Sequence, residues 1–222
     1  MAKKVRTKSL FPSTPKEHIR QLTEWMSHGV YEKEQIIAMA LLCAVAGENM
    51  FLLGPPGTAK SMVASRLKMV FKDGKSFDYL MSRFSTPDEI FGPISISRLK
   101  NDDRYERLTT GYLPEADVVF LDEIWKAGPS IQNTLLTVII EHIFHNGGQI
   151  MRTPMKVLIA ASNELPAKDE GLEALWDRFL VRMVSNCIES DTAFFKMIKG
   201  VKVEMPDIPD GYSQQIDPLR II

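Results

Sequence analysis

Hydrophobic residues along this chain follow two periods, one typical of helices and one typical of buried strands. Apolar positions three and four residues apart predict helices, and these cover residues 15–27, 32–46, 60–71, 130–141 and 171–177. Short apolar runs bounded by turn residues predict strands, and these cover residues 49–53, 75–80, 118–121, 155–161 and 179–184. Because helices alternate with strands, and two strands are apolar on both faces, we expect an α/β fold whose parallel sheet is covered on both sides.

Four segments do not follow this alternation. Residues 91–113 alternate polar and apolar positions around a charged middle, which indicates an inserted hairpin or loop. Residues 143–154 carry Asn146-Gly147-Gly148 between short flanks, a strong hairpin signal. The basic residues 1–14 are expected to form a flexible tail, and the Pro-rich residues 190–222 an irregular C-terminal segment. The domain itself is therefore expected to cover residues 15–189.

Composition narrows the class of protein. The chain has 222 residues, of which 45% are hydrophobic, and a net charge of -1, so no global field draws it to nucleic acid or to a membrane. A basic arm that binds nucleic acid is a minor alternative for the tail. The longest small-apolar stretch, residues 36–46, is shorter than the roughly 20 residues that span a bilayer. Cys43 and Cys187 lack CxxC spacing, so we expect a reducing, cytoplasmic compartment.

One short stretch, "FLLGPPGTAKSMVA" at residues 51–64, matches most of a phosphate-binding loop. Gly54, Lys60 and Ser61 fit the pattern G-x-x-x-x-G-K-[ST], but Ala59 stands where the pattern has Gly. A strand before the loop and a helix after it would aim backbone N–H groups at an anion. If the backbone at residue 59 is already near-helical, Ala costs little, because Gly is required only where φ is positive. The alternative is a chance Gly-Pro turn.

Polar residues follow the later strands. Asp122 and Glu123 come directly after an apolar strand, and two carboxylates beside a phosphate site would bind Mg²⁺ and activate water. Asn163 follows the next strand and could bind the γ-phosphate or the water, although a turn Asn is equally consistent. Arg178 could reach the γ-phosphate of a neighbouring subunit, or form an ion pair with Asp177.

Together these motifs resemble a known family. "GPPGTAKS", "VVFLDEIWKAGPSIQNTLL", "AASNELP" and "ALWDRFLVR" are similar to the MoxR group of AAA+ ATPases. "LMSRFSTPDEIFGP" and "RYERLTTGYLPEA" narrow the resemblance to the RavA-type regulatory ATPases of that group. The resemblance covers approximately residues 18–188, and in this group the loop tolerates Ala before the Lys.

The resemblance implies a fold and a site. The fold is a P-loop NTPase core with a five-stranded parallel sheet in 5-1-4-3-2 order, an insert at residues 91–113 and a hairpin at residues 143–154. The implied catalytic residues are Lys60, Glu123, Asn163 and Arg178. The implied ligands of Mg²⁺ are Ser61 and Asp122. The implied nucleotide contacts are Val30, Tyr31, Gly54, Pro55, Pro56, Gly57, Thr58, Ala59, Lys60, Ser61, Met62 and Asp122. Arg182 is a weaker second candidate for a cation that serves another subunit.

The resemblance also implies an activity and partners. We expect an Mg²⁺-dependent ATPase, acting as a homohexamer with its arginine finger in trans, that remodels a partner protein. A protein with a von Willebrand A domain is the partner expected from the resemblance. Family members continue into a helical lid, for which we see no room in the aperiodic residues after Ile188. The alternative is therefore a nucleotide-binding interaction module without a lid, which turns over little ATP.

Overall fold

A five-stranded parallel sheet forms the centre of the protein. We describe a computed structural model, which places residues 15–71, 73–167 and 171–199. The sheet consists of β1 (Met50–Leu53), β2 (Ser76–Leu80), β3 (Val118–Asp122), β6 (Val157–Ser162) and β7 (Val181–Val184). A separate two-stranded hairpin consists of β4 (Ile143–Asn146) and β5 (Gln149–Arg152). The helices are α1 (Pro15–Met26), α2 (Glu34–Ala46), α3 (Lys60–Val70), α4 (Pro87–Phe91), α5 (Ile96–Asp102), α6 (Pro129–Glu141), α7 (Glu173–Trp176) and α8 (Asp191–Ile198).

The strand order confirms the expected topology. The strands lie in the order β2-β3-β6-β1-β7 and every pair is parallel. With the hairpin left out, this order reads 2-3-4-1-5, which is the expected 5-1-4-3-2 from the other edge. β1 therefore lies between β6 and β7, where Leu53 is opposite both Ser162 and Val184.

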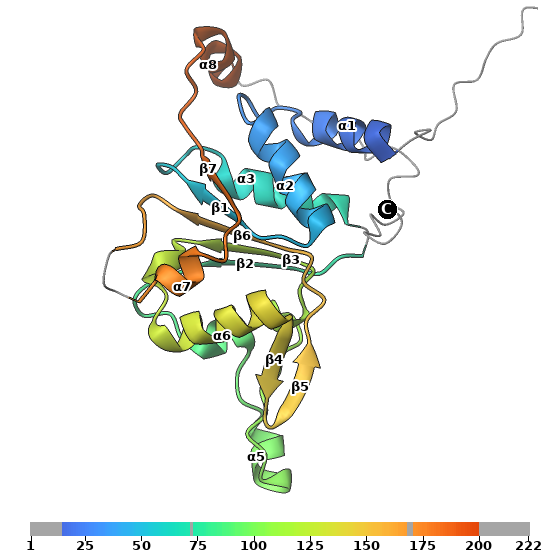
Figure 1. Ribbon diagram of the computed structural model, residues 1–222, viewed down its shortest axis with the longest axis vertical. Helices are drawn as coiled ribbons and strands as arrows, with labels where there is room; N and C mark the ends of the chain where they lie inside the picture. Colours follow the sequence, from blue (N-terminus) through green and yellow to red (C-terminus); the bar gives the residue numbers. More distant parts are fainter. Residues whose placement is uncertain (1–14, 72, 168–170, 200–222) are drawn as a thin grey trace, which may run out of the picture.

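Helices cover both faces of the sheet and bury two separate cores. Alternate residues of each strand point to opposite faces, so Leu52 packs with α1, α2 and α3 on one face. Its neighbour Phe51 packs on the other face with residues of α6, α7 and β4. Figure 1 shows these two layers, with α1, α2 and α3 on one side of the sheet and α6 and α7 on the other. The strands predicted to be apolar on both faces, β3 and β6, are buried at nearly every position.

The insert after α4 differs from its prediction. Its base is a short antiparallel pairing of Ile94 with Arg107, as a hairpin would have. Its middle, expected to be hairpin or loop, is instead the helix α5, which Ser95 caps by accepting a hydrogen bond from the Arg98 N–H. An ion pair between Arg98 and Asp102, four residues apart, supports this helix at 2.8 Å. The polar-apolar alternation therefore predicted the pairing at the base of the insert but not the helix in its middle.

A second difference lies after the last strand. The prediction of irregular structure from residue 190 is wrong for residues 191–198, which form α8. Ser190 begins this helix, since its hydroxyl accepts a hydrogen bond from the Ala193 N–H. The prediction treated residues 190–222 as one segment because the later residues are Pro-rich, and it therefore missed the helix that Ser190 caps. Residues 200–222, like the basic residues 1–14, lie outside the described part of the chain.

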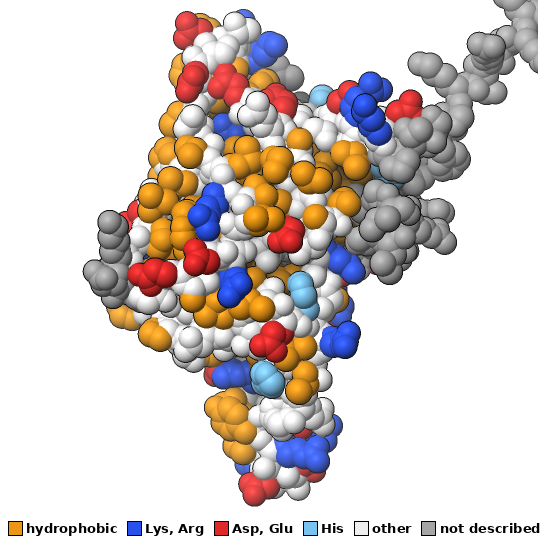
Figure 2. All heavy atoms as spheres, viewed as in Figure 1, with side chains coloured by type: hydrophobic (Ala, Val, Ile, Leu, Met, Phe, Trp, Pro, Cys, Tyr) orange, Lys and Arg blue, Asp and Glu red, His pale blue; other side chains and the backbone are white. Residues whose placement is uncertain are grey.

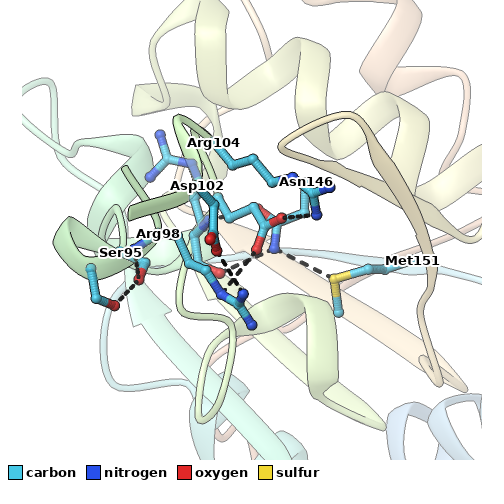
Figure 3. Close-up of polar contacts among 9 residues, drawn as sticks. Ser95, Arg98, Asp102, Arg104, Asn146 and Met151 are labelled. Atoms are coloured by element: carbon cyan, nitrogen blue, oxygen red, sulfur yellow. Dashed lines mark hydrogen bonds and ion pairs between the residues drawn. The ribbon is translucent and has the colours of Figure 1, made fainter. Parts of the chain in front are cut away.

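The insert and the hairpin form one joint arm. The Asn146 side chain accepts a hydrogen bond from the backbone N–H of Arg107 at 2.6 Å and donates one to its carbonyl oxygen at 3.0 Å. Gly147 packs so closely on this segment that an added Cβ would lie 2.3 Å from Glu106 Cγ. The Arg107 guanidinium in turn bonds Asp88 and the carbonyl oxygen of Gly92. Figure 3 shows Asn146 of the hairpin among the polar side chains of the insert, and Figure 1 shows α5 and the hairpin extending together from the body.

Hydrophobic and charged side chains occupy different parts of the surface of the arm. Exposed apolar side chains on the insert include Ile96, Leu99, Tyr105 and Leu108. Figure 2 shows hydrophobic side chains along one side of the arm and charged side chains around its tip. Across the described ranges, 15–71, 73–167 and 171–199, we find no helix with the length and apolarity to cross a bilayer.

Replacement of Asn146 by Ala should separate the hairpin from the insert while the sheet stays folded. The change removes two hydrogen bonds to residue 107, each worth about 1 kcal/mol. We expect the Arg107 amide to exchange its hydrogen on the order of tenfold faster, as measured by NMR. The matched control is Asn133→Ala, which removes an exposed amide of α6. Unchanged exchange at Arg107 would show that the two segments do not depend on this contact.

Candidate functional site

The phosphate-loop candidate connects the carboxyl end of β1 to the amino end of α3. Gly54 begins it and donates its N–H to the carbonyl oxygen of Ser162 at 3.0 Å. Ser185, just after β7, donates its N–H to the carbonyl oxygen of Leu53 at 2.7 Å and its hydroxyl to that of Thr58 at 2.8 Å. A Cβ on Gly54 would lie 2.3 Å from the Ser185 oxygen, so only Gly fits here. Both neighbouring strands thus fix the loop.

Lys60 occupies the first position of α3 and folds back over the loop. Its ammonium donates hydrogen bonds to the carbonyl oxygens of Gly54 at 2.6 Å and Pro55 at 2.9 Å. The residue is only 8% exposed, yet it makes no ion pair with any described residue. A buried cation that bonds only neutral oxygens favours an anion beside it. The amino end of a helix adds to this preference.

The backbone of Ala59 is not near-helical. Its φ of 65° and ψ of 19° place it in the left-handed region, so the condition under which Ala would cost little is not met. This conformation costs a non-glycine residue about 1–2 kcal/mol. Glu123 has the same conformation, with φ of 53°. Two turns that carry candidate functional residues therefore contain backbone strain.

A cavity of about 650 Å³ lies over the loop, within the size range of small-molecule sites. Of the residues predicted to contact nucleotide, all but Gly54 and Pro55 line it. Glu123, Asn163 and Arg178 do not line it. The lining residues are Gly29, Val30, Tyr31, Lys33, Pro56, Gly57, Thr58, Ala59, Lys60, Ser61, Met62, Asp122, Asn186, Cys187, Ile188, Phe194 and Met197.

The cavity contains the hard oxygen donors that Mg²⁺ requires. Ser61 is exposed and Asp122 is partly buried, and both line the cavity. The Asp122 carboxylate accepts only the N–H of Glu123, at 3.0 Å, among the described residues. A hydroxyl and a carboxylate beside a phosphate-binding loop are suitable ligands for Mg²⁺.

Glu123 and Asn163 follow the carboxyl ends of adjacent strands beside this cavity. The Glu123 carboxylate is 16% exposed and lies 3.3 Å from the ammonium of Lys126. Asn163 is exposed and follows Ser162, the residue whose oxygen accepts the N–H of Gly54. Because β6 lies between β1 and β3, Asn163 leaves the sheet between the phosphate loop and the two carboxylates.

Arg178 and Arg182 have different environments. Arg178 is exposed, and its side chain makes no hydrogen bond or ion pair with a described residue. Arg182 instead donates to the carbonyl oxygens of Phe179 and Trp176, both at 2.9 Å. These contacts commit Arg182 to its own chain and count against its interpretation as a second intersubunit cation.

Sequence reasoning missed one wall of the cavity. Lys33 is 4% exposed and donates to the carbonyl oxygen of Asn186 at 2.9 Å. The carboxylate of Glu32 accepts the N–H groups of Glu189 and Ser190, and these bonds lower the pKa of Glu32. Together the two side chains hold the segment after β7 against the turn at Gly29–Tyr31. The Ser190 cap and the apolar spacing in α8 were the available signals for this wall.

Comparison with known proteins identifies the family. A family model described as the MoxR domain in the MoxR-vWA-beta-propeller ternary systems matches residues 17–218. The chain belongs to this MoxR family. Its fold agrees, since the crystal structure of a "putative ATPase" from Cytophaga hutchinsonii superimposes with a TM-score of 0.66 at 17% identity, over 85% of this chain and 57% of that one.

Relatives of this MoxR domain are longer than the chain. It is 42% identical to the uncharacterized protein MJ0079 of Methanocaldococcus jannaschii, over 82% of the chain and 47% of the relative. It is 39% identical to MJ0812 of the same organism, over 91% and 55%. It is 28% identical to the chaperone MoxR1 of Mycobacterium tuberculosis, over 68% and 40%. The chain thus spans about half the length of the relatives it matches.

Replacement of Ala59 by Gly should stabilise this MoxR domain. Gly adopts the left-handed conformation without steric cost, so we expect the free energy of unfolding to rise by about 1 kcal/mol. Urea denaturation measures the change. The control is Ala64→Gly inside α3, which should lower the free energy of unfolding by about 2 kcal/mol, because it loses helix propensity and a buried methyl group. If both variants are destabilised alike, the left-handed backbone at residue 59 is wrong.

Proposed function

We propose that this protein binds ATP with Mg²⁺ and hydrolyses it to remodel a partner protein. The observation that carries the proposal is the buried ammonium of Lys60, which has no carboxylate partner among the described residues and lies at a cavity large enough for a nucleotide. A polyphosphate would supply the missing negative charge. The MoxR family and the ATPase fold support the same conclusion.

Each candidate residue has a role that its position allows. The loop N–H groups and Lys60 bind the β- and γ-phosphates, while Ser61 and Asp122 hold Mg²⁺. Held by these two residues, Mg²⁺ would supply positive charge against the phosphate oxygens. Glu123 accepts a proton from the attacking water, and Asn163 orients that water or the γ-phosphate. The turn at Val30 and Tyr31 binds the base, against the wall that α8 and residues 186–188 provide.

The arginine finger comes from another copy of the chain in this proposal. Arg178 precedes the amino end of β7, whereas the phosphate loop follows the carboxyl end of β1. Because these strands are parallel, with Met50 opposite Val181, about 13 Å of strand separates the start of β7 from the loop. An exposed arginine without a described partner is suited to reach a neighbour's nucleotide, as in a ring.

The joint arm is the part of the molecule that we propose contacts the partner protein and remodels it. It extends from the body and carries exposed apolar side chains, which are typical of protein-binding surfaces. The family description pairs the MoxR domain with vWA and beta-propeller proteins. A protein with a von Willebrand A domain is therefore the partner we propose.

Glu123→Gln should retain ATP and lose hydrolysis. The amide cannot accept the water proton, so we expect turnover to fall at least roughly 100-fold while the dissociation constant of Mg·ATP stays within about twofold. Phosphate release and calorimetry measure the two quantities. Glu141→Gln, an exposed change on α6, is the control. Normal hydrolysis by Glu123→Gln would overturn the assignment.

The protein concentration should itself change the specific activity. Since the finger is supplied in trans, turnover per chain should rise as the protein assembles. Sedimentation with Mg·ATP reports assembly in the same samples. A stable monomer that binds ATP with negligible hydrolysis would instead favour the second candidate, a nucleotide-binding interaction module. The exposed Arg178, which has no described partner, is also consistent with a chain that acts alone.

A further inference from the structure

Two arginines lie four residues apart, Arg178 just before β7 and Arg182 within it, and only Arg178 lacks a side-chain partner among the described residues. Both side chains are exposed, but Arg178 makes no hydrogen bond or ion pair with a described residue, whereas Arg182 makes two hydrogen bonds to backbone carbonyl oxygens. This contrast suggests that Arg182 fixes the position of Arg178.

The contacts of Arg182 bracket Arg178. Its Nη2 donates to the carbonyl oxygen of Trp176 and its Nε to that of Phe179, so the guanidinium fixes the backbone on both sides of residue 178. Its Cζ lies 4.1 Å from the centre of the Trp176 ring, a cation–π contact. Asp177 is a weaker fourth partner at 3.9 Å.

The turn needs this support because its own structure is short. α7 has four residues and lacks a side-chain cap, and helices of that length are not stable by themselves. After it, the Asp177 N–H still bonds the Glu173 carbonyl oxygen at 2.9 Å, and the turn then continues through two longer bonds of 3.2 Å, from the Arg178 N–H to Leu175 and from the Phe179 N–H to Trp176. Arg182 has a firm base, since it lies within β7 opposite Phe51 of β1.

Aromatic rings hold the other side of the same turn. Trp176 lies 5.2 Å from Phe51 and 5.8 Å from Trp125, measured between ring centres. Phe179 lies 5.9 Å from Phe51 and 6.2 Å from Trp125. Trp176, two residues before Arg178, and Phe179, directly after it, thus pack against the core, and Arg182 bonds the same turn from β7.

We propose that Arg182 is a positioning residue, which holds the turn at Trp176–Phe179 so that Arg178 reaches the γ-phosphate bound by a second copy of this chain. The inference rests on the proposed function, because Arg178 needs a nucleotide to act on. Arg182 itself stays in its own subunit. Its planar fork bonds two carbonyl oxygens at once, which a lysine ammonium on a flexible stem cannot reproduce in the same geometry.

Subunit mixing tests the inference. Arg182→Ala alone should lower kcat roughly 10- to 100-fold with KM for ATP within about twofold, because a misplaced finger loses part of its roughly 1000-fold effect. Glu123→Gln chains are inactive but carry an intact Arg178 turn. Mixing them with Arg182→Ala chains should restore turnover, since the Glu123→Gln chains supply the finger to intact sites. No restoration would overturn the inference.

A second mixture separates this inference from the proposed function. Arg178→Ala mixed with Glu123→Gln should also regain activity, and its failure would contradict the finger in trans itself. If that mixture works and the Arg182→Ala mixture does not, only the role of Arg182 is wrong. The double variant Arg178→Ala, Arg182→Ala should be no slower than Arg178→Ala. Arg20→Ala, a surface change in α1, is the control.

Hydrogen exchange tests the same contact without any nucleotide. In Arg182→Ala the amides of Arg178 and Phe179 should exchange on the order of tenfold faster, whereas the Ile159 amide in β6 should not change. Arg182→Lys should restore less than half of the lost turnover and protection. Unchanged exchange in Arg182→Ala, or complete rescue by Lys, would show that the fork does not hold the turn.

Discussion

Parallel pairing of β1 with β6 and β7 is the constraint on which the candidate site depends. It brings the residues that follow three strands to one edge of the sheet, where Gly54 bonds Ser162 and Ser185 bonds Leu53. The close contact of Gly54 with Ser185 leaves no room for a side chain. The loop is therefore shaped by its neighbours in the sheet before any ligand binds, which lowers the cost of ordering it on binding.

Backbone strain and an unpaired buried charge both occur in this framework. Ala59 and Glu123 have left-handed backbones, and Lys60 is buried beside carbonyl oxygens alone. Such features cost free energy and persist only where the surrounding structure determines them. The two cores, one on each face of the sheet, hold the backbone in these conformations. A nucleotide site that is electrostatically incomplete is consistent with a protein whose proposed ligand is a polyanion.

Several irregular segments of the molecule are held by a side chain that bonds their backbone from a neighbouring segment, near or far in the sequence. Asn146 holds the insert, Glu32 and Lys33 hold the segment after β7, and Arg182 holds the turn of Arg178. Each bond satisfies backbone groups that no helix or strand would satisfy. These contacts attach three parts to the central sheet: the arm, the cavity wall and the turn that carries Arg178. Each part has its own role in the proposed cycle.

The sequence by itself determined the strands, the loop after β1 and the two adjacent carboxylates at the end of β3, because these depend on local periodicity and spacing. The strand order followed only from the resemblance to a family. The sequence did not determine the helix within the insert or α8, whose capping residues are weak signals in polar surroundings. Only the tertiary structure decided that residue 59 is left-handed, that Asn146 joins two segments some forty residues apart, and that Arg182 serves its own chain. The physical reason is that these features depend on which backbone groups meet across the fold, and the spacing of residues along the chain does not contain that information.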